Sequence, residues 1–298
     1  MKSLSPNLAG ALFMAGSMTT FTINDAFVKL LGDHIPFFQL LFVRGLAVVA
    51  IMAVMAWRAG AFSMPIPKKD RKLILIRSAS ETAAAYFFLT ALFKMPIANV
   101  TAILQALPLT VSLGAMLIFG ENVGWRRFVA IGVGFAGVML IVQPGGDVFS
   151  IYSVYALAAV VCVTIRDLAA RRLSSEVPSM TVAISAAVGI LVFASVGATF
   201  TDWVPMTTLD IAFLAGAVVS VIAAYLFAVM AMRVGDIGFV APFRYTSLLA
   251  ALFLGLIVFD EWPDSLTMIG AVIVVATGVY TLWRERATQT AATGEESA

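Results

Sequence analysis

Asp25-Ala-Phe-Val-Lys29, followed by Pro36, recurs in the second half of the chain as Asp167-Leu-Ala-Ala-Arg171, followed by Pro178. In both copies the basic residue stands four positions after the aspartate and the proline eleven positions after it, within almost purely apolar sequence. Weak internal symmetry of this kind is typical of secondary transporters, because a substrate site between two related helix bundles can open alternately to each side of a membrane. The pattern therefore predicts two homologous membrane-spanning halves.

The repeat continues further along the chain. Ala91–Val100 aligns with Ala231–Val240, and Phe119-Gly-Glu121 aligns with Phe259-Asp-Glu261. An apolar run with spaced glycines follows in both halves. Few residues are identical between the two halves, so the evidence for the repeat is the order and spacing of these stretches.

The composition of the chain excludes a water-soluble globule. Of its 298 residues, 61% are hydrophobic and 12% are charged, and the mean hydropathy is +0.99. This leaves too little polar surface to cover a soluble domain, so lipid is the expected solvent. A spanning helix needs about 20 mostly apolar residues, whereas a spanning strand alternates at about every second residue, a pattern not seen in this chain. The expected fold class is an all-α polytopic membrane protein.

Charged residues and Pro/Gly breaks divide the chain into ten apolar segments. We expect a first repeat of five helices over residues 1–145, a second over 146–286, and a disordered cytoplasmic tail over 287–298, which is rich in Thr, Ala and Glu. Because the first repeat crosses the membrane an odd number of times, the second repeat is expected to be inverted. The expected spans are residues 8–31, 36–57, 73–93, 97–119, 126–143, 151–170, 179–200, 209–232, 238–259 and 266–283.

The distribution of basic residues orients the chain. With the N-terminus in the cytoplasm, fourteen of the 19 Lys and Arg residues fall on the inner side, and Lys94 alone falls on the outer side. Short cytoplasmic loops collect positive charge, so both termini are expected in the cytoplasm of a bacterial inner-membrane protein. The net charge of +2 is small and forms no basic stripe, which argues against nucleic acid as a partner. The sequence leaves the oligomeric state open.

Residues for metal or redox chemistry are scarce. The chain has one Cys and one His, so no metal site and no cofactor are expected, and Cys162 is expected to fill a helix interface. His34 falls in an outer turn and is expected to be solvated, with proton sensing as the alternative. Gly132-Val-Gly134-Phe-Ala-Gly137 satisfies a dinucleotide-binding pattern, but no strand precedes it. We interpret it as a small-residue face for helix packing, matched by Gly270 and Gly278.

Five short motifs follow one another in a specific order: Asn24-Asp25-x-x-x-Lys29, Phe42-Val-Arg44, Ala98-Asn-Val-Thr-Ala102, Phe119-Gly-Glu121 with Trp125, and Ala241-Pro-Phe-Arg-Tyr245. Together they resemble the EamA branch of the drug/metabolite transporter superfamily, over residues 8–285. The resemblance implies ten helices in two inverted five-helix repeats around a central cavity, and a secondary transporter that works by alternating access.

Within that branch, two stretches indicate a narrower similarity. Pro242–Tyr245 and Asp260-Glu-Trp-Pro-Asp264 look most similar to bacterial carriers of S-adenosylmethionine and, less clearly, of riboflavin. Amino-acid and drug exporters of the same superfamily are the alternative. Because substrates vary widely within one fold, the resemblance supports the fold more than the cargo.

Glu81 is the first candidate for substrate binding. It lies about one-third of the way into the third expected span, where a charged side chain costs about 2.5–3.5 kcal/mol and must therefore face protein or water. A carboxylate in apolar surroundings is pushed toward protonation, which suits a proton carrier, and it would also attract a cationic cargo. A structural pair with Arg77, one turn earlier, is the alternative.

Arg244 is the second candidate for substrate binding. Pro242 removes one backbone hydrogen bond and can open the helix locally, as happens where transporters line their sites. A guanidinium there could hold a carboxylate or phosphate in a two-pronged contact. The alternative is an internal ion pair, with Asp25, Asp167 or Glu81 as its partner.

Aromatic and amide side chains complete the expected cavity. Planar rings can stack on a nucleobase or a flavin, and their faces attract a sulfonium cation. For each residue, packing or lipid contact is the alternative. The residues are Tyr86 with the neighbouring Phe87, Gln105, Tyr225 and Tyr245.

The repeated charged residues are candidates for gating or coupling. Asp25 with Lys29 lies near the outer end of its helix, and Asp167 with Arg171 lies near the inner end of the matching helix. A pair near water is worth about 0–1 kcal/mol, so it could open in each transport cycle. A purely structural role in helix packing is the alternative.

Two other classes of function compete with a carrier. An intramembrane enzyme would need His, Cys or clustered carboxylates, which these spans do not supply. A channel is less easily dismissed, although buried charges that recur in both halves favour a carrier. The sequence therefore predicts a non-enzymatic secondary transporter of a small organic metabolite, surrounded by lipid, with protons as a candidate coupling ion.

Overall fold

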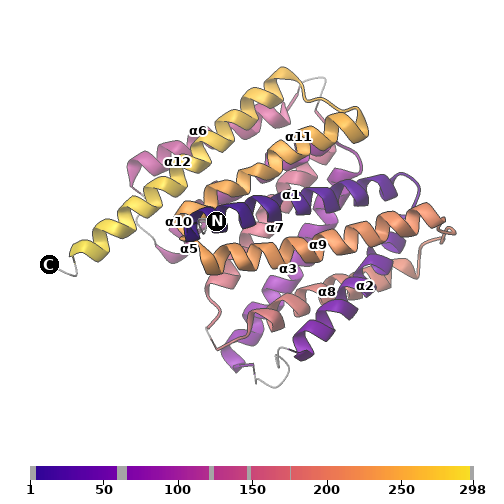
Figure 1. Ribbon diagram of the computed structural model, residues 1–298. Coiled ribbons are helices and arrows are strands. Elements are labelled where there is room, and N and C mark those ends of the chain that lie inside the picture. The colour runs from indigo at the N-terminus through magenta and orange to yellow at the C-terminus, as the bar shows by residue number, and fades with distance from the viewer. Residues whose placement is uncertain (1–4, 59–65, 121–123, 146–148, 175, 296–298) are drawn as a thin grey trace. The chain divides into compact units, whose positions relative to one another are not determined.

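The structure is a computed structural model, and it describes residues 5–58, 66–120, 124–145, 149–174 and 176–295. Within these residues every regular element is a helix (Figure 1). Contacts divide the chain into two compact units. Unit 1 comprises Met1–Ile23, Met95–Ser153 and Ser220–Ala298, and unit 2 comprises Asn24–Lys94 and Val154–Val219. Each unit therefore draws on both halves of the sequence.

Helices coincide with all ten expected spans. Eight helical segments of the described chain are long and apolar enough to cross a membrane. The first half holds α1 (Pro6–Gly32), α2 (Phe37–Arg58), α3 (Lys68–Leu92), α4 (Ile97–Leu104), α5 (Leu107–Phe119) and α6 (Trp125–Val142). The second half holds α7 (Ile151–Arg171), α8 (Ser179–Ala198), α9 (Thr208–Val234), α10 (Ile237–Val240), η2 (Ala241–Tyr245), α11 (Thr246–Phe259) and α12 (Ser265–Glu295).

Two long helices, α1 and α3, lie outside that set of eight, and both carry polar and charged residues. Helix α1 is rich in Ser and Thr and carries Asp25 and Lys29, and α3 begins with Lys and Arg residues and carries Glu81 near its middle. A spanning helix with such residues needs protein neighbours for them, because lipid cannot satisfy them.

Two expected spans are interrupted at matching positions. In the first half, α4 ends at Leu104 and α5 begins at Leu107, so the break contains Gln105. In the second half, the 3-10 turn η2 ends at Tyr245 and α11 follows it. Both new segments carry a proline in their first turn, Pro108 and Pro242, where its missing N–H and fixed φ are tolerated. The offset that aligns Phe119 with Phe259 also aligns Gln105 with Tyr245. The breaks therefore recur with the repeat.

In unit 1, α6 and α12 lie side by side and run antiparallel (Figure 1). A Cβ atom added to Gly270 would lie 2.5 Å from the carbonyl oxygen of Gly137 and 2.8 Å from the Ile141 side chain. Gly134 meets Leu109 and Thr277 in the same way. The small-residue face expected from the sequence is therefore confirmed for these glycines, whereas Gly132 faces open space.

A polar clasp joins the end of α6 to the start of α12. Gln143, which closes α6 with φ of 48°, donates its side-chain N–H to Asp264 Oδ2 at 2.8 Å. Asp264 also accepts hydrogen bonds from the Thr267 hydroxyl and from the backbone N–H groups of Leu266 and Thr267, so it caps α12. Burial opposes ionisation of Asp264, but these hydrogen bonds outweigh it and hold its pKa below the ordinary value.

In unit 2, α8 packs against both α2 and α3. Gly197 lies against Phe38 and Gly45 against Leu191, so α2 and α8 run antiparallel. Ser78 bonds to Ser185 and Gly189 lies against Thr82, so α3 and α8 run parallel.

Helix α7 packs against α3 in the antiparallel sense within unit 2. Asp70 near the start of α3 accepts hydrogen bonds from Ser174, which follows α7. Tyr86, farther along α3, contacts Tyr155 near the start of α7. This arrangement places the middle of α3 beside the second half of α7.

His34 is half-exposed, in line with the expectation of a solvated residue, but it also has a partner that the sequence did not indicate. Its Nε2 lies 2.6 Å from Asp210 Oδ1; the His34 side chain is 52% exposed and that of Asp210 is 4% exposed. Nearby, the buried Gln39 exchanges two hydrogen bonds with the backbone of Val204, at 2.7 and 2.9 Å. Within unit 2, the turn after α1 therefore contacts the first turn of α9, and the start of α2 contacts the loop before α9.

The C-terminal segment also differs from expectation. Helix α12 continues to Glu295, through most of the stretch 287–298 that was expected to be disordered, and 296–298 lie outside the described residues. Arg, Ala, Gln and Glu favour helix, so the helix can continue beyond the apolar span.

Gly270→Ala is expected to destabilise the protein by about 1–3 kcal/mol, because its methyl group would overpack the backbone contact between α6 and α12. Gly132→Ala on α6 is the matched control. Its methyl group would meet open space, and the substitution is expected to be neutral or stabilising by up to about 1 kcal/mol. Thermal unfolding of the purified proteins measures both effects, and equal losses of stability in the two variants would contradict the packing.

Asp264→Asn is expected to lower stability at pH 7 by about 0.3–1 kcal/mol, because a negative charge favours a helix N-terminus. The pKa of Asp264 is lowered by folding, so its charge stabilises the protein above the ordinary aspartate pKa of about 3.9 and loses this effect as pH falls through the lowered value. The difference between wild type and variant should therefore shrink below about pH 4. A difference that is constant down to pH 3 would argue against this role.

Candidate functional site

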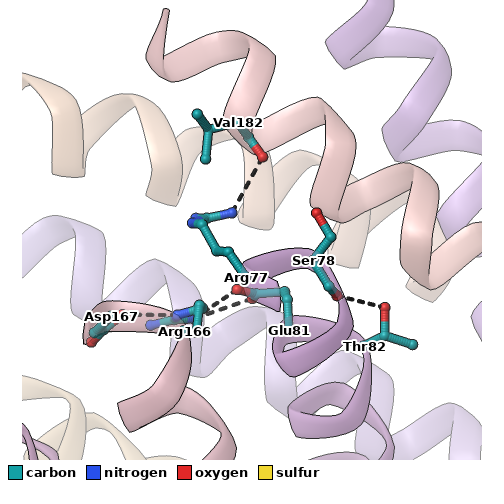
Figure 2. A network of polar contacts seen from close by, with 7 residues as sticks. All are labelled: Arg77, Ser78, Glu81, Thr82, Arg166, Asp167 and Val182. Carbon is teal, nitrogen blue, oxygen red and sulfur yellow. Dashed lines mark hydrogen bonds and ion pairs between the residues drawn. The ribbon is translucent and has the colours of Figure 1, made fainter. Parts of the chain in front are cut away.

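Glu81 lies near the midpoint of α3, which begins five residues earlier than the expected span. Its two carboxylate oxygens accept hydrogen bonds from Nη1 of Arg166 on α7, at 3.2 and 3.1 Å (Figure 2). Among the described residues, Arg166 is the ion-pair partner of Glu81. The alternative pair with Arg77 does not form; Arg77 instead donates to the carbonyl oxygen of Val182 at 3.2 Å.

Asp167 shares the same guanidinium. Nε of Arg166 lies 2.9 Å from Asp167 Oδ1, so Arg166 bridges its own neighbour on α7 and Glu81 on α3 (Figure 2). The sequence suggested Arg171, four positions after Asp167, as its partner. In the described chain Asp167 pairs with Arg166 instead. The side chains of Arg166, Glu81 and Asp167 are 23%, 19% and 30% exposed, so this cluster is not sealed.

Hydroxyl groups surround the cluster on α3. Ser78 donates to the Ser185 hydroxyl on α8 at 3.2 Å. Thr82 donates to the Ser78 carbonyl at 2.9 Å, as Figure 2 shows. These bonds fix the α3 turn on which Glu81 stands. The acids of the described chain form no group of three or more His, Cys, Asp or Glu that could hold a metal.

A second polar cluster occupies the matching place in the first half. With the offset that aligns Asp25 with Asp167, Asn24 corresponds to Arg166. Asn24 donates to Asp25 at 2.9 Å and accepts from Arg44 of α2 at 2.9 Å. The first half thus brings its guanidinium from another helix, whereas the second half carries it beside the aspartate. Lys29, the expected partner of Asp25, is buried.

An aromatic cluster occupies the same two helices as Glu81 and Arg166. The ring of Tyr86 on α3 lies 5.5 Å from that of Phe87 and 6.4 Å from that of Tyr155 on α7. Phe37 and Phe193 approach Tyr86 edge-on, at 5.6 and 5.9 Å. Tyr86, Phe87 and Tyr155 are partly exposed, so the cluster offers ring surface as well as packing.

The other substrate-binding candidates lie in unit 1. Gln105, at the break after α4, donates to the Ser247 hydroxyl at 2.6 Å. Tyr245 is buried, its hydroxyl lies against Gly278, and that hydroxyl has no hydrogen-bond partner among the described residues. Arg244 and Tyr225 are both exposed, and the ring of Tyr225 packs edge-on against that of Phe21 at 5.2 Å.

Arg166 is the functional candidate that reasoning from the sequence did not select. Two signals pointed to it: it is a charged residue within a span, and it stands beside the repeated aspartate where the first half has Asn24. Its partner on α3 could not be read from the sequence, because contacts between separate helices leave no spacing pattern. Glu121, part of one family motif, lies outside the described residues.

Comparisons with known proteins agree with the fold. The model of the EamA-like transporter family matches residues 8–143 and again residues 150–283. The S-adenosylmethionine uptake transporter of Rickettsia prowazekii is 25% identical over 95% of this chain and 96% of the relative. The riboflavin transporter of Vibrio cholerae is 30% identical over 65% of each chain. A protein of known crystal structure, 15% identical, superposes with a TM-score of 0.65 over 91% of this chain and 96% of its own.

The matches define a polytopic helical transporter as the class of this protein. Specifically, the chain belongs to the EamA-like transporter family, within the drug/metabolite transporter superfamily. It is a multi-pass inner-membrane protein and a transporter rather than an enzyme. The family and the relatives that the sequence motifs indicated are confirmed.

Proposed function

We propose that this transporter carries a small organic cation or zwitterion with a planar ring, by alternating access, and that S-adenosylmethionine is the first cargo to test. The observation that carries the proposal is Glu81: a partly exposed carboxylate at the middle of α3, paired with a single arginine. Relatives named as S-adenosylmethionine uptake transporters match nearly the whole chain, which supports this cargo class.

The chemistry of the site suits such a cargo. A sulfonium or ammonium group would be drawn to Glu81, because a carboxylate away from bulk water attracts a cation strongly. Tyr86 and Phe87 follow Glu81 by five and six residues on α3, a rise of about 8–9 Å, within the reach of one small molecule. Their rings could stack on a planar group of the cargo. We keep Arg244 of unit 1 as a proposed contact for a carboxylate or phosphate.

Protons are our proposed coupling ion. Glu81 and Asp167 are two carboxylates with one shared guanidinium, so a proton on either one would reduce their repulsion. A proton on Glu81 would also compete with a cationic cargo. Asp25, Lys29, Asp167 and Arg171 keep a proposed gating role as individual residues. Arg44 and Arg166 are additional members of the clusters around the two aspartates.

We also propose that residues 1–145 and 146–286 are inverted five-helix repeats, with both termini in the cytoplasm. Support comes from the two separate family matches and from the helix breaks at Gln105 and Tyr245. It also comes from equivalent helices that pack antiparallel, α2 with α8 and α6 with α12. A two-fold axis in the membrane plane relates such helices in inverted repeats.

Purified wild-type protein in vesicles should exchange labelled for unlabelled S-adenosylmethionine, because a carrier exchanges cargo across a membrane. S-adenosylhomocysteine, which has no positive sulfur, should compete at least tenfold more weakly, a difference of about 1.4 kcal/mol. Glu81→Gln should remove this discrimination. Glu81→Gln should also remove any decline in the rate of S-adenosylmethionine exchange between pH 8 and pH 5, because glutamine at position 81 does not titrate.

Arg77→Gln is the matched control, since Arg77 lies one turn from Glu81 but bonds to Val182. It should keep the preference for the charged sulfur. Equal competition by both compounds in the wild type would refute a cationic site at Glu81.

The inverted topology predicts which loops face outward. In a Cys162→Ala background, Lys94→Cys and Asp202→Cys should react with a membrane-impermeant maleimide in intact cells, since both positions are exposed at expected outer turns. Arg172→Cys and Arg233→Cys should react only after permeabilisation. Labelling of all four positions from one side would rule out the inversion.

A further inference from the structure

We propose that Arg166 is a built-in substitute for the positive group of the cargo. In the empty carrier it neutralises Glu81, and when a cationic group binds Glu81 it keeps its contact with Asp167. This inference rests on the proposed function, and it assigns a specificity role to a residue that neither the repeat nor the family motifs singled out.

The geometry divides the guanidinium between two acids. Nε faces Asp167 at 2.9 Å, and Nη1 faces both oxygens of Glu81 at 3.1 and 3.2 Å. Because different nitrogen atoms make the two contacts, the contact to Asp167 can remain while the contact to Glu81 opens. Figure 2 shows Arg166 between the two acids, with Arg77 directed toward Val182.

The two acids differ in how they are attached to Arg166. Asp167 is its neighbour on α7 and moves with it, whereas Glu81 belongs to α3 and can separate from it. A helix movement that pulls α3 from α7 would therefore leave Arg166 with a partner and Glu81 without one. An unpaired charge within a membrane protein is costly, so such a movement favours a state in which another cation has replaced Arg166.

This arrangement makes cargo binding an exchange of cations. The cargo must displace Arg166 from Glu81, so a neutral molecule cannot complete the site. Arg166 and Asp167 should then have opposite effects on the affinity for the cargo. Arg166 opposes cargo binding by occupying Glu81, and Asp167 assists it by accepting Arg166.

The test is the binding of S-adenosylmethionine to the full-length protein in detergent, measured by calorimetry at pH 7.5. Arg166→Gln should bind about 3–10-fold more tightly than wild type, because the competing cation is gone. Asp167→Asn should bind about 3–10-fold more weakly, because Arg166 then loses the acid that would hold it away from Glu81. In a Glu81→Gln background, Arg166→Gln should bring no gain.

A structural role for Arg166 gives another pattern. If both Arg166→Gln and Asp167→Asn weaken binding, or if either leaves it unchanged, the proposal that Arg166 takes the place of the cargo's positive group is overturned. Should Arg166→Gln fail to fold, Arg166→Lys replaces it: lysine keeps the charge but cannot bridge two acids with separate nitrogens. Arg166→Lys should then bind more tightly than wild type, and weaker or equal binding would overturn the proposal.

A measurement without cargo separates this inference from the proposed function. A hydrophobic carbodiimide modifies carboxyl groups that are not held in an ion pair, and mass spectrometry locates the product. Glu81 should react several-fold faster in Arg166→Gln than in wild type, and Arg77→Gln should not change the rate. If wild type binds no S-adenosylmethionine but Glu81 shows this difference in reactivity, the proposed cargo is wrong, whereas the proposed pairing of Arg166 with Glu81 is supported. If Glu81 reacts equally in all three proteins, the inference fails whatever the cargo is.

Discussion

A carboxylate at the middle of a helix in lipid needs a positive partner, and the contact between Glu81 and Arg166 supplies it. This constraint links two helices, because the guanidinium that pairs with Glu81 of α3 comes from α7. Asp167 adds a second acid to the same arginine, and the cluster stays partly exposed. A fully buried pair would be a fixed structural element, because neither partner could find a replacement. Partial exposure is what allows a pair to take part in a transport cycle.

The packing of unit 2 holds this contact in place. Helices α3 and α7 run antiparallel, with Asp70 bound to Ser174 at one end and Tyr86 against Tyr155 at the other. Helix α8 supports α3 along its length through Ser185 and Gly189. These neighbours satisfy the polar face of α3, which explains how a helix too polar to rank among the apolar spans is accommodated. The proposed site therefore combines a polar helix, α3, with a helix of the apolar set, α7, and α8 supports α3.

Much of the fold could be predicted from the sequence because lipid imposes a simple rule on helix length and composition. Ten helical regions were placed close to their observed limits, and the glycine contact between α6 and α12 followed from small residues with a helical period. The expectations that missed concern contacts between side chains. Arg77 and Glu81 have the spacing of a pair, yet Arg166 from another helix is nearer. His34 is half-exposed as expected, but its contact with Asp210 could not be predicted because Asp210 is far away in the sequence. Periodicity reports which residues share a face, but it cannot report what that face meets.

The difference between the two halves bears on how an internal repeat acquires function. At corresponding positions the first half has Asn24 beside Asp25, with a guanidinium from α2, and the second half has Arg166 beside Asp167. In the first half, Asn24 lies between Arg44 and Asp25 and bonds to both, so the guanidinium reaches that acid through an amide. In the second half the guanidinium touches its aspartate directly and has a nitrogen left to reach Glu81. Two copies that were identical here would bind alike in both orientations of the carrier. Divergence at this one position gives the second half the cation that the proposed exchange requires.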